Sequence, residues 1–200
     1  MRSGNSGHRL PSINKSEGQT EYVLGMYALI FVMILSMATL QILQYKTDSD
    51  IAEDALAASA LASLDVDPYR YGTDHKLVIN DPSHALEIFQ NALKGNMELD
   101  ADYRPLSQNS SYISGAVTIE DFRIYLVDTD EVTEYRVSGY GTDVSTGLYG
   151  EMKTPGGQIV RSAGCYAAVS FDTDGFLGIK IRTYKQAYAE MVADPERVRE

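Results

Sequence analysis

The feature that most constrains this chain of 200 residues is an uncharged apolar run close to its N-terminus. From Tyr22 to Leu43 the sequence reads YVLGMYALIFVMILSMATLQIL, with no Asp, Glu, Lys or Arg. As an α-helix this run extends over about 33 Å, enough to cross the hydrocarbon core of a bilayer. A cleaved signal peptide typically has a shorter apolar stretch, of about 7 to 15 residues. The run therefore predicts one membrane-spanning helix in the cell membrane.

Charge is distributed unevenly on the two sides of this run. Residues 1–16 contain Arg2, Arg9 and Lys15 and no acidic residue, whereas residues 22–200 carry 14 basic and 26 acidic residues, a net charge of −12. Because basic flanks stay on the cytoplasmic side of a membrane helix, we expect a cytoplasmic N-terminus and an extracytoplasmic main domain. The acidic balance argues against nucleic acid as a partner, since phosphates attract clustered Lys and Arg.

The pattern divides the chain into three expected parts. Residues 1–16 form a basic cytoplasmic leader, residues 17–66 a helix that spans the membrane in its first half and is amphipathic in its second, and residues 67–200 an extracytoplasmic domain. The length of the last part is that of one domain. The fold class that we expect is α+β, with the long N-terminal helix packed on an antiparallel β-sheet.

The amphipathic half of the helix is rich in alanine, in the stretch DALAASALAS. Its expected apolar face comprises Ile51, Ala55, Ala58 and Ala62, with Leu61 beside them. Alanine favours the helix and leaves a smooth surface that another backbone can approach closely. Such a face packs either on the chain's own domain or against another subunit, and the two are compatible.

A second helix is predicted in the domain. KLVIN, residues 76–80, has the composition of a short strand, and Asp81 and Pro82 then suit the cap and the first position of a helix that ends at Lys94-Gly95. The apolar face of this helix comprises Ala85, Phe89, Ala92 and Leu93.

Short runs rich in Val, Ile, Tyr and Phe follow between Ser111 and Tyr184. They are YISGAVTI, DFRIYLV, TEYRVSG, GQIVRS, CYAAVSF and FLGIKIRTY. The sequences VDTDEV and FDTDGF place turns between neighbouring runs, which favours antiparallel pairing in a sheet of about five or six strands. We expect the glycines from Gly139 to Gly157 to lie in connecting loops, and residues 185–200 to form a short helix and a frayed tail.

No pattern in the sequence indicates a catalytic residue, a metal site or a cofactor. The histidines are His8, His75 and His84, and none has a second histidine at metal-binding spacing. The Asp-x-Asp turns at Asp128 and Asp172 lack the Glu that an EF-hand loop has at its twelfth position. Cys165 lies in an expected strand, where a small buried hydrophobic residue is the usual role. The sequence predicts a non-enzymatic protein.

The junction before the apolar run reads KSEGQTEY, from Lys15 to Tyr22. It resembles the processing region of type IV pilins and, through its Glu-Tyr pair, the Flp and TadE-like pseudopilins of tight-adherence (Tad) pili. The resemblance implies that a prepilin peptidase cuts between Ser16 and Glu17, which makes Glu21 and Tyr22 the fifth and sixth residues of the mature chain. The family usually has glycine before the cut, and cleavage after Gly18 would make Glu21 the third residue.

In that family, the glutamate pairs with the new amino group of a neighbouring subunit during assembly, and the fold is a long helix on a sheet domain. The resemblance therefore implies a minor pseudopilin or TadE-like component of a Tad or type IV-like pilus assembly system. Its partners would be the bilayer, other pilin-like subunits, an assembly platform and a prepilin peptidase. One alternative is a membrane-tethered extracytoplasmic binding or adhesin domain that does not polymerise. An anchored enzyme, with a site assembled from distant residues, is another.

Overall fold

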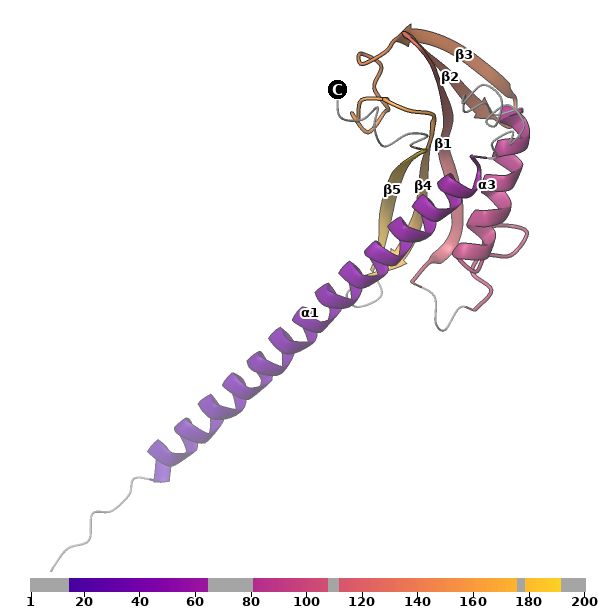
Figure 1. The fold of residues 1–200 in the computed structure, drawn as a ribbon. Coiled ribbons are helices and arrows are strands. Elements are labelled where there is room, and N and C mark those ends of the chain that lie inside the picture. Colours follow the sequence, from indigo (N-terminus) through magenta and orange to yellow (C-terminus); the bar gives the residue numbers. More distant parts are fainter. Residues whose placement is uncertain (1–14, 65–80, 108–111, 176–178, 192–200) are drawn as a thin grey trace, which may run out of the picture. The chain divides into compact units, whose positions relative to one another are not determined.

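A computed structural model describes residues 15–64, 81–107, 112–175 and 179–191 of the chain (Figure 1). The chain forms two compact units, Met1–Gln44 and Tyr45–Glu200. Helix α1, Lys15–Ala62, contributes residues to both units. The rest of the described structure is one further helix and five strands, in the order α3, β1, β2, β3, β4 and β5. The predicted α+β class with a long N-terminal helix is confirmed.

The second unit contains a sheet of five antiparallel strands in the order β3-β2-β1-β4-β5. The strands are β1 (Ser114–Asp128), β2 (Glu131–Ser138), β3 (Gly141–Leu148), β4 (Gly164–Asp174) and β5 (Lys180–Glu190). The expected turn at VDTDEV joins β1 to β2, and Thr129 there adopts a φ of 55°. The predicted antiparallel sheet is therefore confirmed.

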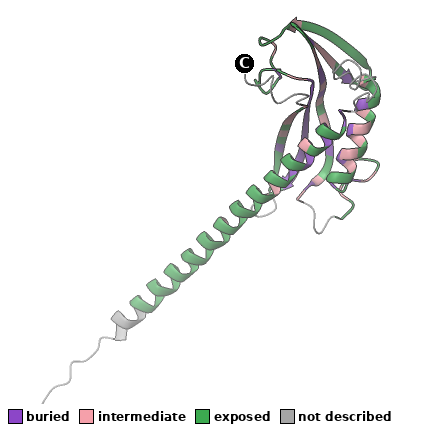
Figure 2. Ribbon diagram, viewed as in Figure 1, coloured by how far each residue is buried: buried purple, intermediate pink, exposed green. Residues whose placement is uncertain are grey.

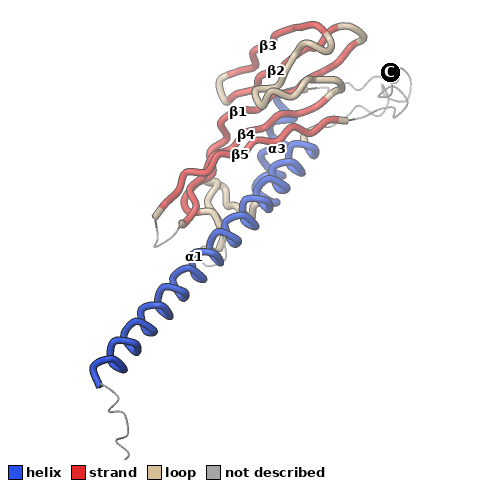
Figure 3. Tube along the Cα trace, turned by 90° about the vertical axis from the view of Figure 1, so that its left-hand side faces the viewer, coloured by secondary structure: helices blue, strands red, loops and turns tan. Residues whose placement is uncertain are grey.

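Two helical segments cover one face of this sheet. They are residues 45–62 of α1, called here the outer part of α1, and α3, Pro82–Asn96 (Figure 3). Alternate residues of a strand point to the same face, so Phe122 and Ile124 of β1 meet the helices together. The rings of Phe89 and Phe122 lie 4.9 Å apart between centroids, which joins α3 directly to the middle strand.

The start of α3 agrees with the cap predicted from the sequence. A carboxylate oxygen of Asp81 accepts a hydrogen bond of 2.8 Å from the backbone N–H of Ser83, and Pro82 is the first helical residue. Ala85, Phe89 and Leu93 are buried, as predicted, while Ala92 is half-buried. The helix continues one residue beyond the expected end, to Asn96.

Three predictions about the strands are wrong. YISGAVTI and DFRIYLV belong mostly to one long strand, β1, whose pairing with β4 passes through register irregularities between residues 114 and 121. Residues 141–148, expected as a loop, form β3, because a tight turn at residues 139–140 folds them back onto β2. Residues 157–162 form no strand and take part in one isolated bridge, from Lys153 to Ile159.

The expected helix after residue 185 is also wrong. Strand β5 continues to Glu190, since its pairing with β4 extends as far as Gly164 and overrides the helix propensity of its alanines. Residues 192–200, and the predicted strand at residues 76–80, lie outside the described residues.

The second face of the sheet carries a smaller core beneath the connection between β3 and β4. Val160 from this connection packs with Tyr125 and Tyr166, which point away from the helices. The rings of Tyr125 and Tyr188 meet edge to face at 6.0 Å. The glycine-rich connection therefore acts as a cover for this face.

Candidate functional site: the exposed surfaces of helix α1

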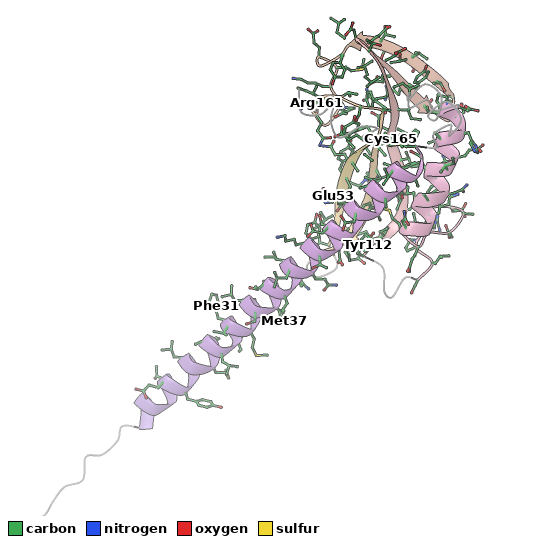
Figure 4. All side chains as sticks on the ribbon, in the orientation of Figure 1. Phe31, Met37, Glu53, Tyr112, Arg161 and Cys165 are labelled. Carbon is green, nitrogen blue, oxygen red and sulfur yellow. The ribbon has the colours of Figure 1, made fainter. Side chains whose placement is uncertain are left out.

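In the first unit, the described residues from Thr20 onward form an apolar helix surface on which no other described residue packs. One helix in the described structure is long and apolar enough to cross a membrane, from Thr20 to Ala62, and none of its most apolar 18-residue stretch is buried. Figure 2 shows this stretch as exposed, and only Ala38 within it is half-buried. Phe31 is 66% exposed and Met37 59%, and both side chains project away from the helix (Figure 4). These properties are compatible with a single-pass membrane anchor.

The residues singled out by the sequence lie at the beginning of this helix. Ser16, Glu17 and Gly18 belong to the first turn of α1, and Glu21 and Tyr22 to the following one. The side chains of Glu21 and Tyr22 are exposed, Tyr22 by 75%. Glu21 forms no ion pair with any residue that the structure describes. A carboxylate thus stands at the boundary of the apolar stretch with its oxygens open to another molecule.

The outer part of α1 buries a different face from the one predicted. Its core-facing residues are Ala52, Ala55, Leu56, Ser59, Ala60 and Ser63. By contrast, Ile51 and Leu61 are 48% and 53% exposed, and Ala58 and Ala62 are exposed as well. Only Ala55 is shared between the two faces, so the alternative in which the predicted face packs on the chain's own domain is wrong. Alanine occurs on all sides of this stretch, so it does not by itself indicate the buried face. The predicted face was chosen from apolar residues and therefore left out Ser59 and Ser63.

Ser59 and Ser63, which directly follows the end of α1, both bond their hydroxyls to carbonyls of α1 and therefore tolerate burial. The Ser59 hydroxyl donates to the Ala55 carbonyl at 2.6 Å, and that of Ser63 donates to the Ala60 carbonyl at 2.7 Å. Small side chains at these positions let the helix lie close to the sheet. The thiol of Cys165 on β4 is fully buried in the same core (Figure 4), and burial raises its pKa to about 12 while the Ser63 hydroxyl opposes part of the rise.

The opposite side of the outer part of α1 carries apolar side chains without a partner among the described residues, with the exposed Asp54 among them. We call these apolar residues the outer strip, and they are Ile51, Ala58, Leu61 and Ala62. At the flank of the helix, the Lys185 ammonium pairs with Glu53 at 3.1 Å and links β5 to α1. The domain therefore fixes which side of the outer part of α1 is covered, and the outer strip remains exposed.

Polar side chains on the second face of the sheet form a paired network. Arg123 contacts Asp121 at 2.7 Å and Glu134 at 3.3 Å, and Arg136 contacts Asp121 at 3.2 Å. An open groove of about 480 Å³ adjoins this network, lined by residues of α3, β1, β2 and the turn before β3. The described residues that line it include no histidine, cysteine or lysine. Among the charged residues that line it, Arg136 and Asp121 pair with one another, and Glu120 pairs with Arg182 outside the groove.

The search for metal ligands gives no candidate among the described residues. No group of three or more His, Cys, Asp or Glu side chains is placed to hold an ion there. His84 is exposed on the first turns of α3, with Nδ1 at 3.4 Å from the Glu87 carboxylate. His8 and His75 lie outside the described residues, as does most of the predicted leader.

Comparison with protein-family models, with curated proteins and with solved structures gave no match to this chain.

Proposed function

We propose that this chain is a non-enzymatic, membrane-anchored minor pseudopilin or TadE-like component of a Tad or type IV-like pilus assembly system. The observation that carries the proposal is that one helix, α1, has two exposed surfaces. Its first stretch is apolar, exposed and preceded by the Glu21 carboxylate. Its outer part is held by a sheet domain on one side and presents the outer strip on the other.

The position of Glu21 supports an assembly role. A carboxylate at the edge of hydrocarbon is costly unless an opposite charge meets it. An α-amino group has a pKa of about 7.7 to 8.0 and is largely protonated at neutral pH. A neighbouring subunit that begins at Glu17, or at Gln19, would supply that charge close to the membrane surface. Ser16, Glu17 and Gly18 would then be the processing region for a prepilin peptidase.

The outer strip extends the same contact beyond the bilayer. Helices approach one another closely where small residues such as alanine line the interface. Ala58 and Ala62 provide such a surface, flanked by the exposed apolar side chains of Ile51 and Leu61. Other pilin-like subunits and an assembly platform in the membrane are the partners that such a helix fits. The basic leader places the N-terminus in the cytoplasm and the acidic sheet domain outside.

The first residue of the mature protein tests this function. Membranes from cells with and without a prepilin peptidase are compared by mass spectrometry of the N-terminal peptide. The proposal expects a start at Glu17, or at Gln19, that depends on the peptidase. An uncut start at Met1 or Arg2 in both strains would contradict it and favour a tethered binding or adhesin domain.

A further inference from the structure

The two edges of the sheet differ in how they are protected. Exposed strand edges usually carry charges, prolines or bulges that discourage pairing with another chain. Strand β5 has such charges, namely Lys180, Arg182, Lys185 and Glu190. Strand β3, with the sequence GTDVSTGL, has one charged residue, Asp143, and no proline. Its pairing with β2 runs through all eight residues without a register shift. Within the described residues, the β3 edge is therefore regularly paired with β2, nearly uncharged and without a proline or a bulge.

Backbone groups on the outer side of β3 remain open for hydrogen bonding. The turn at residues 139–140 closes the pair Ser138 and Gly141, and alternate residues after it face β2. Thr142, Val144 and Thr146 consequently turn their N–H and C=O groups outward. No strand of the described structure lies on that side, because β3 is the end of the sheet.

Several large apolar and aromatic side chains around this edge are exposed to solvent. Val144 is 59% exposed and Leu148 61%, and the flanking Tyr140 and Tyr149 are fully exposed and 46% exposed. Every residue of β3 except the half-buried Gly147 is exposed. An edge strand with this surface is suited to the addition of a further strand.

We propose that β3 pairs antiparallel with β3 of a second copy of this chain, about a two-fold axis at Ser145. In this register Val144 lies opposite Thr146 of the partner subunit, and their outward backbone groups form about four interchain hydrogen bonds. Asp143 lies opposite the partner's Gly147, so the two acidic side chains are kept apart. Gly141 lies opposite the partner's Tyr149, whose ring covers a strand position without a side chain of its own.

The sequence of β3 and its flank is complementary to itself in this register, which favours a second copy as the occupant. A two-fold axis at Asp143 instead of Ser145, which shifts one strand by four residues against the other, would set Asp143 opposite the partner's Asp143, and like charges directly opposite destabilise a sheet. The proposed register avoids that repulsion and gives each glycine a side chain on the facing strand. Each copy supplies the same edge, as a two-fold interface requires. The pairing uses only the sheet domain and is independent of the proposed pilus role.

Disulfide trapping of the full chain in detergent tests the pairing. Ser145 would face the partner's Ser145 at a position without interchain hydrogen bonds, where opposing Cα atoms are about 4.5 Å apart. We expect Ser145→Cys to yield a disulfide-linked dimer of twice the 22.1 kDa chain mass under mild oxidation. Asn91→Cys, equally exposed but on α3, should stay monomeric. The native Cys165 is buried, so it should contribute little to the formation of disulfide-linked dimers.

A second substitution separates strand pairing from chance collision. Adding Thr146→Pro to Ser145→Cys removes an outward N–H and should abolish the dimer, while protection of Cys165 from thiol reagents verifies that the domain is folded. If that variant does not fold, Val144→Lys takes its place, because it sets two ammonium groups into the same short interface. Absence of the Ser145→Cys dimer, equal trapping of Asn91→Cys, a dimer that survives both second substitutions, or a disulfide to a different protein in native membranes would each overturn the proposal.

Discussion

The side-chain amide of Asn96, the last residue of α3, donates a hydrogen bond of 3.0 Å to the hydroxyl of Ser59 on α1. The same hydroxyl donates to the Ala55 carbonyl at 2.6 Å, so its donor and acceptor functions are both used. Ser59 is fully buried, whereas Asn96 is exposed. This contact fixes the end of α3 against the outer part of α1 and so helps to set which face of α1 remains outside.

Removing this contact should have a modest and non-additive effect. We expect Ser59→Ala to lower the free energy of unfolding by about 1 to 2 kcal/mol, since the hydrogen bonds to the Ala55 carbonyl and from Asn96 are both lost. Asn96→Ala should cost less, because an exposed amide can exchange its partner for water. The double variant should cost less than the sum of the two, as contacting residues do. Denaturant titration of the full chain in detergent measures all three, and strict additivity would show that the hydrogen bond does not form.

The sequence predicted the kinds of element well and their pairing partners less well. The uncharged run, the Asp81 cap and the VDTDEV turn each depend on local chemistry, and each agrees with the structure in the described residues. Strand β3 has a Gly-Thr-Ser composition that local propensity assigns to a loop, and it is a strand because β2 pairs with it. Pairing with a neighbouring strand leaves little trace in the residues of the strand itself.

The same limit applies to the candidate site. The sequence predicted the apolar stretch, since hydropathy is visible residue by residue, while the role of Glu21 in assembly stays a prediction. Of the two alternatives for the predicted apolar face of the outer part of α1, packing on the chain's own domain is wrong, because alanine packs on either side and the buried serines are satisfied through Ala55, Ala60 and Asn96. A pattern of serines four residues apart, each able to bond the preceding turn, was the signal that pointed to the correct face.

Two alanines on opposite sides of α1 provide a matched test of this face. Ala60 is fully buried and Ala58 is exposed. Ala60→Leu should destabilise the domain by about 1 to 3 kcal/mol because a filled core has no room for the added atoms. Ala58→Leu should change the stability of the monomer by less than about 0.5 kcal/mol. Thermal unfolding in detergent measures both changes in stability. A larger loss of stability in Ala58→Leu than in Ala60→Leu would show that the predicted face packs in the core.

Burial of Cys165 predicts a loss of stability at alkaline pH. The folded state keeps the thiol protonated up to a pKa of about 12, whereas its ordinary pKa is 9.0. Between these values the folded state binds more protons than the unfolded state, so stability falls as the pH rises, by up to about 1.4 kcal/mol per pH unit for one group. Cys165→Ala should reduce this slope.

The same thiol reports on folding. At pH 8 we expect Cys165 to resist a thiol reagent in the native protein and to react once the protein is unfolded by denaturant. Rapid labelling of the native protein would show that the thiol is accessible, and an unchanged alkaline slope in Cys165→Ala would assign that slope to other groups.

A charge in the middle of the apolar stretch should impair membrane insertion. Val32 is 59% exposed and lies near the centre of Tyr22–Leu43. A lysine at the centre of a membrane helix costs about 2.5 to 3.5 kcal/mol on insertion. Val32→Lys should therefore lower the fraction of protein that resists alkaline extraction from membranes. Leu106→Lys, at a position 70% exposed in the second unit, is the control and should behave as the unsubstituted protein. Equal extraction of the two variants would argue against a membrane-spanning role for this stretch.

Substitution of Glu21 separates membrane anchoring from assembly. Glu21→Gln keeps the size of the side chain and removes its charge, so membrane insertion should be retained or slightly improved while pairing with a neighbouring α-amino group is lost. We expect Glu21→Gln and Glu21→Ala to reduce incorporation into filaments or an assembly complex several-fold, measured by quantitative immunoblotting of sheared and membrane fractions. Glu151→Ala removes an exposed carboxylate from the sheet domain and should incorporate normally. Normal incorporation of Glu21→Gln would leave the helix as a tether alone, because no other charged side chain stands at the start of the apolar stretch in the described residues from Thr20 onward.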